Sequence, residues 1–240
     1  MKSLKEIAKG IPGVRSTFHT FTGLALKRKS TEDIFSEIYI HNKFRGQESI
    51  SGPGSGIDQT RVIISRLPQL FGDFGIRTIL DLPCGDFHWM RQVKLEQVKY
   101  TGADIVADLI NKNKQKYEKE NVRFCKLDLI KDTLPQADLI LCRDCLVHFS
   151  FTDALAALRN ICNSESKYLL ATTFTGRKNN QDIATGQWYP INLEIAPFKL
   201  PPPREIINEK RTEGGDAYKD KSLGLWRVSE IKDALATAPI

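Results

Sequence analysis

The chain has 240 residues, 41% hydrophobic and 27% charged, a balance typical of one globular domain with a sizeable core. No apolar run reaches the ~20 residues that a membrane-spanning helix needs, and the N-terminus lacks the apolar core of a secretory signal. Residues 1–30 hold seven basic side chains and one acidic side chain, which accounts for the net charge of +6. The neutral remainder argues against a broad nucleic-acid-binding face, so no nucleic acid partner is expected.

The cysteines predict a reducing environment. They are odd in number and lie mostly in apolar segments, at Cys84, Cys125, Cys142, Cys145 and Cys162. Such a set is more typical of reduced thiols than of a disulfide framework. We therefore expect a cytoplasmic protein.

The basic segment 1–30 carries apolar residues at roughly helical spacing, interrupted at Gly10 to Gly13. This pattern predicts two short amphipathic helices. They can pack on the body or on a second subunit of a homodimer, or they can contact an anionic membrane surface or an acidic partner. The sequence leaves these alternatives open, so membrane association through residues 1–30 is one expectation.

A helix and a glycine-rich segment follow the arm. Thr31 to Tyr39 reads as a helix with Thr31 as its N-cap. Residues 46–56 contain too much glycine for regular structure and form either a plain linker or a ligand-binding loop. We therefore divide the chain into an N-terminal part, residues 1–56, and a main domain, residues 57–240.

The main domain opens with a strand, a turn and a helix. Residues 77–83 predict a buried strand, followed by a turn through Gly85 and Asp86 and a helix from about Phe87. Such a unit builds a ligand site at the carboxyl edge of an open α/β sheet. Gly85 lets the backbone bend sharply, and Asp86 can cap the helix. A nicotinamide-dependent oxidoreductase remains an alternative, although its fingerprint needs three glycines.

Acidic residues end three successive predicted strands: Asp81, Asp104 and Asp128. Asp104 follows the glycine turn by about 20 residues, the spacing at which an acid accepts both hydroxyl hydrogens of a ribose. Asp128 can accept an adenine amino hydrogen or cap local amides. Two further strands at 137–144 and 167–174 alternate with helices, which predicts a parallel sheet.

The stretch Asp-Leu-Pro-Cys-Gly-Asp at 81–86 resembles the first motif of class I S-adenosylmethionine-dependent methyltransferases, and the match in order and spacing extends over 57–174. The resemblance implies a Rossmann-like α/β fold with a mostly parallel seven-stranded sheet, helices on both faces and an antiparallel last strand. It also implies S-adenosylmethionine as the cofactor. The cofactor-binding residues that we expect are Asp81, Pro83, Cys84, Gly85, Asp86, Trp89, Asp104, Ile105, Asp128, Leu129, Arg143, Ser51 and Gly52.

The candidate catalytic residues, Asp144 and His148, follow the fourth predicted strand. An alcohol acceptor must lose a proton, and a neutral histidine is a suitable base near pH 7. Asp144 can orient this base or contact the acceptor, and Arg143 is expected to pair with a neighbouring acid. Cys142 and Cys145 also suggest zinc or a redox pair, but a structural zinc site needs four ligands, so no metal is predicted. A magnesium-type site that uses Asp144 stays open.

Residues 175–203 predict a long loop with Trp188, Tyr189 and Phe198. A loop of this length in a compact domain is usually functional or disordered, and we interpret it as a substrate-facing lid. Because aromatic rings can stack on sugar faces, the predicted acceptor is an oxygen of a sugar, glycan or other small molecule. A non-catalytic cofactor-binding scaffold, with the arm and this loop binding a partner, is the alternative from a different class.

Overall fold

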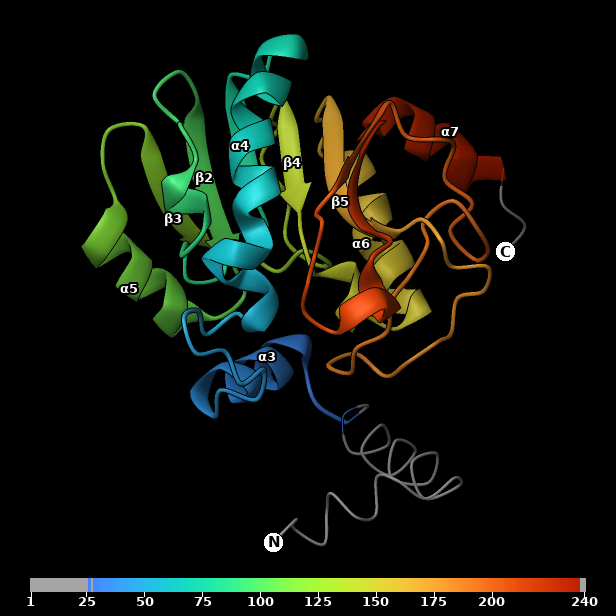
Figure 1. Ribbon diagram of the computed structural model, residues 1–240, viewed down its shortest axis with the longest axis horizontal. Helices are drawn as coiled ribbons and strands as arrows, with labels where there is room; N and C mark the ends of the chain where they lie inside the picture. The colour runs from blue at the N-terminus through green and yellow to red at the C-terminus, as the bar shows by residue number, and fades with distance from the viewer. Residues whose placement is uncertain (1–25, 27, 238–240) are drawn as a thin grey trace, which may run out of the picture.

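The computed structural model describes residue 26 and residues 28–237. The two amphipathic helices expected in residues 1–30 fall almost wholly outside the described residues. The described part folds around a seven-stranded sheet in the order β3-β2-β1-β4-β5-β7-β6 (Figure 1). The strands are β1 (Thr78–Asp81), β2 (Lys99–Asp104), β3 (Val122–Lys126), β4 (Leu139–Cys142), β5 (Tyr168–Phe174), β6 (Glu205–Asn208) and β7 (Lys221–Arg227).

The directions of the strands confirm the predicted sheet. β1 pairs in parallel with β2 and β4, β2 with β3, and β4 with β5. The last strand, β7, runs antiparallel to both β5 and β6. Since parallel strands end at the same edge, the chain after β1, β2, β3 and β4 comes together there.

Helices cover both faces of the sheet, and each uses an apolar stripe. The helices are α3 (Thr31–Ile40), α4 (Ile57–Asp73), α5 (Ala107–Tyr117), α6 (Phe151–Asn163) and α7 (Val228–Thr237), with short turns η1 (Pro53–Ser55), η2 (Met90–Gln92), η3 (Leu146–His148) and η4 (Gly215–Tyr218). α4 and α5 contribute to one buried apolar cluster, and α6 and α7 to the other. On α4, Ile63, Leu67 and Leu70 recur every three to four residues and are buried.

α3 lies across the carboxyl edge of the sheet, below the strands in Figure 1. Its N-cap is Ser30, whose side chain accepts a hydrogen bond from the Asp33 amide, so the prediction of Thr31 as the cap was wrong by one residue. Ser and Thr are equally suited to this position, which is why the pattern did not separate them.

The helix predicted from about Phe87 is absent from the described residues, and only η2 follows the glycine turn. Phe87 has a φ of +58°, which a right-handed helix cannot contain. Its ring packs against Tyr100, Tyr117 and Phe124. These aromatic contacts, rather than the start of a helix, hold the turn in place.

Residues 175–203 contain no helix or strand, as predicted, yet they pack tightly. Phe198, Leu200 and Leu193 are buried, and the side chain of Asn180 is hydrogen-bonded to both the amide and the carbonyl of Asn192. The ordered packing gives this segment a fixed course beside the end of β5. No helix among the described residues is both long and apolar enough to span a bilayer.

Candidate active site

A cavity lies between α3 and the carboxyl ends of β1, β2 and β4. Ile50, Ser51 and Ser55 close it from the glycine-rich segment, and Phe35, Ile38, Tyr39 and Phe44 line it from α3 and the residues just after it. Most of the residues predicted from the sequence also line it: Asp81, Pro83, Cys84, Gly85, Asp86, Trp89, Asp104, Ile105, Asp128, Leu129, Arg143, Asp144 and His148. The fold therefore brings residues from distant parts of the chain to one site.

The glycine turn forms the floor of this cavity and is held by its neighbours. The Cys84 amide donates to Ala103 O at 2.8 Å, and Asn113 Nδ2 donates to Gly85 O at 2.8 Å. Gly85 has a φ of +54°, and a Cβ there would lie 2.2 Å from Ser51 Oγ. The turn thus needs glycine for two reasons, backbone conformation and space.

The glycine-rich segment is fastened to this turn by Asp86. Asp86 Oδ1 accepts from Ser49 Oγ at 2.8 Å, and Oδ2 accepts from the Ile50 amide at 3.0 Å. Asp86 therefore caps no helix, in contrast to its predicted role, because the chain turns through Phe87 instead. Of the two predicted contacts, Ser51 lines the cavity, whereas Gly52 lies behind Phe44, to which its Cβ would come within 3.2 Å.

Two carboxyl groups are buried at the strand ends. Asp104 accepts hydrogen bonds from the Val106 amide at 3.0 Å and the Gly85 amide at 3.2 Å, and burial raises its pKa to about 6. Asp81 accepts from Tyr100 Oη at 2.6 Å, and burial raises its pKa to about 7. Both groups can therefore gain or lose a proton near neutrality, and each can respond to hydrogen-bond donors or positive charge on a ligand.

Asp128 follows β3 by two residues, so it lies beyond the strand in which the sequence placed it. Its Oδ1 accepts from the Ile130 amide at 2.8 Å, which is the local amide contact left open by the sequence. Asp128 and Leu129 nevertheless line the cavity, as Ile105 does.

His148 is half-buried in the cavity wall, with its tautomer set by the backbone. Nδ1 lies 2.9 Å from Gln187 O, and this carbonyl can only accept, so Nδ1 carries a hydrogen and the neutral ring has its lone pair on Nε2. Nε2 has no hydrogen bond to any described residue. Burial lowers the pKa of His148, which keeps the imidazole neutral at pH 7.

Two phenylalanines hold the ring of His148 in place. Phe44 packs over it with centroids 4.8 Å apart, and Phe35 meets it edge-on at 6.4 Å. Both phenylalanines line the cavity. A neutral imidazole held between aromatic rings, with one free lone pair, is suited to accept a proton.

Asp144 ends the fourth strand region in a strained backbone conformation, with a φ of +54°. Its Oδ2 lies 2.6 Å from Lys221 Nζ and 3.2 Å from Arg143 Nη1. Burial raises the pKa of Asp144, but the two cations outweigh it and hold this pKa well below its usual range. Asp144 is therefore a permanent anion and a poor base.

Arg143 pairs with acids, as predicted. It donates to Glu209 Oε2 at 2.7 Å and to Gly54 O at 2.8 Å, and its guanidinium packs over the ring of Trp89. Arg143 thus links β4, the glycine-rich segment and the residue after β6.

The cysteines offer no metal site. Within the described residues, no group of three His, Cys, Asp or Glu side chains is arranged to hold a metal ion. Cys142 and Cys145 are buried free thiols, and the contact with Cys142, followed by burial, raises the pKa of Cys145.

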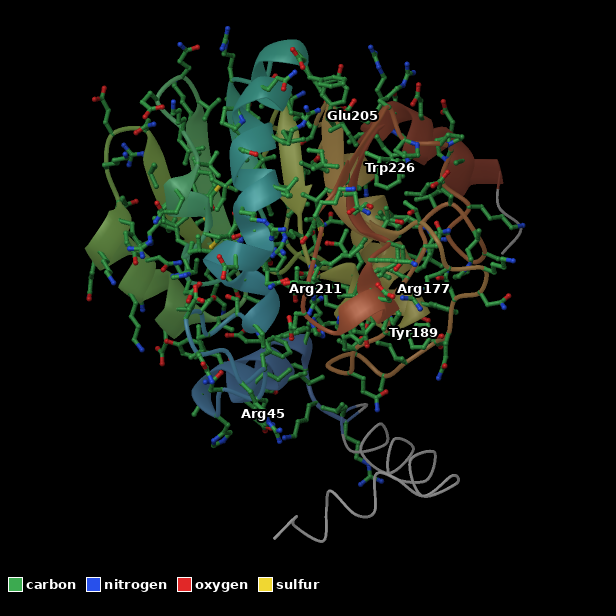
Figure 2. All side chains as sticks on the ribbon, viewed as in Figure 1. Arg45, Arg177, Tyr189, Glu205, Arg211 and Trp226 are labelled. Atoms are coloured by element: carbon green, nitrogen blue, oxygen red, sulfur yellow. The ribbon has the colours of Figure 1, made fainter. Side chains whose placement is uncertain are left out.

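The predicted lid does not cover the cavity, because no residue of 175–203 in the described structure lines it. The segment lies behind His148 instead: Gln187 O contacts the imidazole, and the Gly186 amide donates to His148 O at 2.8 Å. Figure 2 shows Arg177 and Tyr189 of this segment in the lower half of the molecule, on the right. A direct contact between this segment and a substrate stays a prediction.

The sequence missed five residues that build the site: Phe35, Phe44, Asn113, Glu209 and Lys221. Glu209 and Lys221 are polar neighbours of short apolar stretches, and nothing local marks them as buried charges. Asn113 shares the buried face of α5 with Leu109 and Ile110 and is 2% exposed. Phe35 and Phe44 had no signal that separates a cavity wall from a core.

Comparison with protein families adds one match. Residues 79–164 match the family model described as a methyltransferase domain. The matched residues begin in β1 and end just after α6, so they include the glycine turn, Asp104, Asp144 and His148. A comparison with curated protein sequences finds no match.

Solved structures share the fold at low identity. The N-methyltransferase NodS from Bradyrhizobium japonicum WM9 is 14% identical with a TM-score of 0.53, and the match covers 70% of this chain and 96% of NodS. PigF with SAH (15%, TM-score 0.52) and TnmH (16%, TM-score 0.50) match 69% and 70% of this chain. The matched region is only 54% of PigF and 57% of TnmH. At this identity the likeness establishes the fold alone.

Proposed function

We propose that this chain, a class I S-adenosylmethionine-dependent methyltransferase, methylates an oxygen of a sugar, glycan or other small molecule. The observation that carries an oxygen acceptor is His148, a neutral base in the cavity wall with a free Nε2. The apolar rings of Phe35 and Phe44 beside it favour an acceptor with a flat or ring-shaped apolar face.

The residues at the cavity floor fit the cofactor. The carboxylate of Asp104 sits beside the glycine turn and can accept the two ribose hydroxyls, and Asp128 with Ile105 is suited to the adenine. Asp81 lies at the end of β1, where its charge can balance the cationic part of the cofactor. When bound, S-adenosylmethionine would supply an activated methyl group: the acceptor oxygen would bond to the methyl carbon as the carbon–sulfur bond breaks, and S-adenosylhomocysteine would leave.

His148 and Asp144 have different roles toward the acceptor. His148 Nε2 receives the proton of the acceptor hydroxyl. General-base catalysis of this kind raises a reaction rate by roughly 10²- to 10⁴-fold. Asp144, already bound by two cations, accepts no proton and serves as a fixed negative charge near the acceptor. The aromatic wall from α3 holds the acceptor, since correct positioning contributes most to a direct displacement.

The test is methyl transfer from labelled S-adenosylmethionine to a panel of monosaccharides, oligosaccharides, phenols and amines, read by mass spectrometry. We expect a methyl ether, and we expect His148→Gln to lower kcat by about 100-fold or more while the affinity for S-adenosylhomocysteine is kept. His41→Gln, on an exposed histidine outside the cavity, is the matched control. Methylation of nitrogen alone, or an unchanged His148→Gln variant, overturns the proposal.

Binding measurements separate the two alternatives. Thermal stabilisation by S-adenosylhomocysteine and none by NAD excludes the oxidoreductase. Binding of S-adenosylhomocysteine without turnover on any acceptor favours the scaffold. Membrane contact through residues 1–30 is tested by vesicle sedimentation with and without residues 1–25, and a homodimer by light scattering.

A further inference from the structure

Three charged side chains meet beneath Asp144, and two of them are fully withdrawn from solvent. The side chains of Glu209 and Lys221 are 0% and 1% exposed, and that of Arg143 is 3% exposed, whereas Asp144 is 28% exposed and lines the cavity. Charges buried this deeply are rarely retained without paired and well-ordered partners.

Each member of this cluster is held by at least two others. Glu209 accepts from Arg143 Nε at 3.2 Å and Nη2 at 2.7 Å, a two-point contact, and it lies 3.3 Å from Lys221 Nζ. Lys221 in turn donates to Asp144 Oδ2 at 2.6 Å. Glu209 therefore fixes both cations that bind Asp144.

The topology explains why these residues meet. Figure 2 shows Glu205, the first residue of β6, in the upper part of the molecule and Arg211, which follows β6, lower down, so β6 runs toward the cavity and brings the next residue, Glu209, there. The antiparallel β7 begins at this edge with Lys221. The hairpin thus places an acid and a base beside the end of β4, although the residues 209 and 221 lie outside the methyltransferase-domain match.

The two oxygens of Asp144 differ in their contacts. Oδ2 is bound by Lys221 and Arg143, while Oδ1 has one long contact, from Thr172 Oγ1 at 3.5 Å. The amide of Asp144 is also held, by Thr172 Oγ1 at 2.8 Å, in its left-handed conformation. Oδ1 therefore keeps the capacity to accept a hydrogen bond from a ligand.

We propose that Lys221 and Glu209 are positioning residues that fix Asp144 so that Oδ1 binds a second hydroxyl of the acceptor, next to the one that His148 deprotonates. The preferred acceptor is then a vicinal diol, as in a sugar or a catechol, rather than an isolated alcohol. This inference rests on the proposed function. It goes beyond it by giving Asp144 a substrate contact and by naming the residues that support it.

The charge of Asp144 can be followed without any acceptor. Carboxyl ¹³C NMR of the full chain from pH 3 to 8 should show Asp144 ionised throughout. In Lys221→Met we expect it to titrate within this range, because burial raises its pKa and the nearest cation is gone, with only Arg143 and the more distant Arg211 left to oppose burial. Lys221→Arg should restore the wild-type behaviour.

The control is Lys167→Met, which removes another lysine–aspartate pair with the same 2.6 Å contact, to Asp138 rather than Asp144. It should leave the titration of Asp144 unchanged. If Lys221→Met does not fold, Lys221→Met/Glu209→Gln removes one cation and one anion together and serves in its place. An Asp144 titration that is the same in the Lys221 variants and the wild type overturns the positioning role.

The acceptor preference is measured on matched pairs: catechol against phenol, and methyl glycosides against their monodeoxy forms. We expect wild type to favour the diol by roughly tenfold or more in kcat/KM, and Asp144→Asn and Lys221→Met to lose this preference. An equal preference in wild type and Lys221→Met overturns the proposal. If no hydroxyl compound is methylated at all, the proposed function fails, while the NMR titration still decides whether Lys221 sets the state of Asp144.

Discussion

Ser51 Oγ occupies the space beside Gly85 in which any larger residue would place its side chain. A Cβ on Gly85 would lie 2.2 Å from Ser51 Oγ and 3.2 Å from Ser51 Cβ, although the two residues are far apart in the sequence. Real Cβ atoms do not approach other atoms so closely, so the two positions are coupled by packing.

This coupling predicts a non-additive pair of substitutions. Gly85→Ala should destabilise the protein by the left-handed backbone, about 1–2 kcal/mol, and further by the contact with Ser51. In a Ser51→Gly background, Gly85→Ala should lower the free energy of unfolding only by the cost of the left-handed backbone. Urea unfolding of the four proteins measures the difference. Gly75→Ala is the control, because Gly75 has a φ of +62° and nothing near its Cβ position, and strictly additive effects at 51 and 85 would contradict the prediction.

Asp104→Asn should weaken binding of S-adenosylhomocysteine by roughly 10- to 100-fold, because the variant replaces a charged acceptor by a neutral one. In wild type the affinity should also fall as the pH drops below about 6, since the pKa of Asp104 is raised to about 6 and the protonated form is the weaker acceptor. Calorimetric titrations at pH 5 and 8 check both effects. Asp108→Asn, on the exposed start of α5, should bind as wild type does.

Asp81→Asn should stabilise the protein, and more so at high pH. Burial raises the pKa of Asp81 to about 7, while in the unfolded chain it titrates near 3.8. The folded state therefore binds more protons than the unfolded state between these values, so wild-type stability contributed by Asp81 is present below pH 4 and declines as the pH rises to 7. Asparagine can still accept from Tyr100 and has no charge to bury.

The stability difference between Asp81→Asn and wild type, measured by urea unfolding, should grow from pH 4 to pH 7 and then stay level. Taking the difference removes the opposite trend from Asp138, where burial is outweighed by Lys167 and by amide hydrogen bonds and the pKa is lowered to about 2. A constant difference across this range would show that Asp81 ionises as readily as an exposed aspartate.

Tyr39→Phe should speed release of S-adenosylhomocysteine by up to about fivefold. Lys112 Nζ donates to Tyr39 Oη at 2.8 Å, which ties α3 to α5 beside the cavity, and an exposed contact of this kind contributes about 0.2–1 kcal/mol. Stopped-flow displacement measures the rate. Tyr117→Phe removes a hydroxyl that makes no hydrogen bond within the described structure, and its rate should equal that of wild type.

The sequence predicted the parts of the molecule that depend on local patterns. Apolar runs of four to seven residues marked the strands, and Asp104 was found because its distance from Gly85 is fixed by the connection between two neighbouring parallel strands, β1 and β2. Such features need only the chain between two neighbouring elements. The methyltransferase resemblance rested on the same local order.

The sequence did not reveal features that depend on distant packing. Nothing local distinguishes Phe44 in a cavity wall from a core phenylalanine, and Lys221 at a strand start looks like an exposed charge until β6 supplies Glu209. The helix predicted at Phe87 was wrong because the ring of Phe87 finds three aromatic partners on other elements, and these hold its backbone in a left-handed conformation.

The origin of the cavity walls has an evolutionary consequence. Asp104 and the glycine turn belong to residues 79–164, whereas the aromatic wall comes from before this stretch and the buried hairpin pair from after it. Changes in either flank can thus alter which molecule is accepted while Asp104 and the glycine turn, the proposed cofactor contacts of the middle stretch, stay unchanged. A chimera that exchanges only residues 31–45 with those of a related enzyme should therefore change the acceptor preference and keep the contacts of Ser49 and Ser51 with the glycine turn.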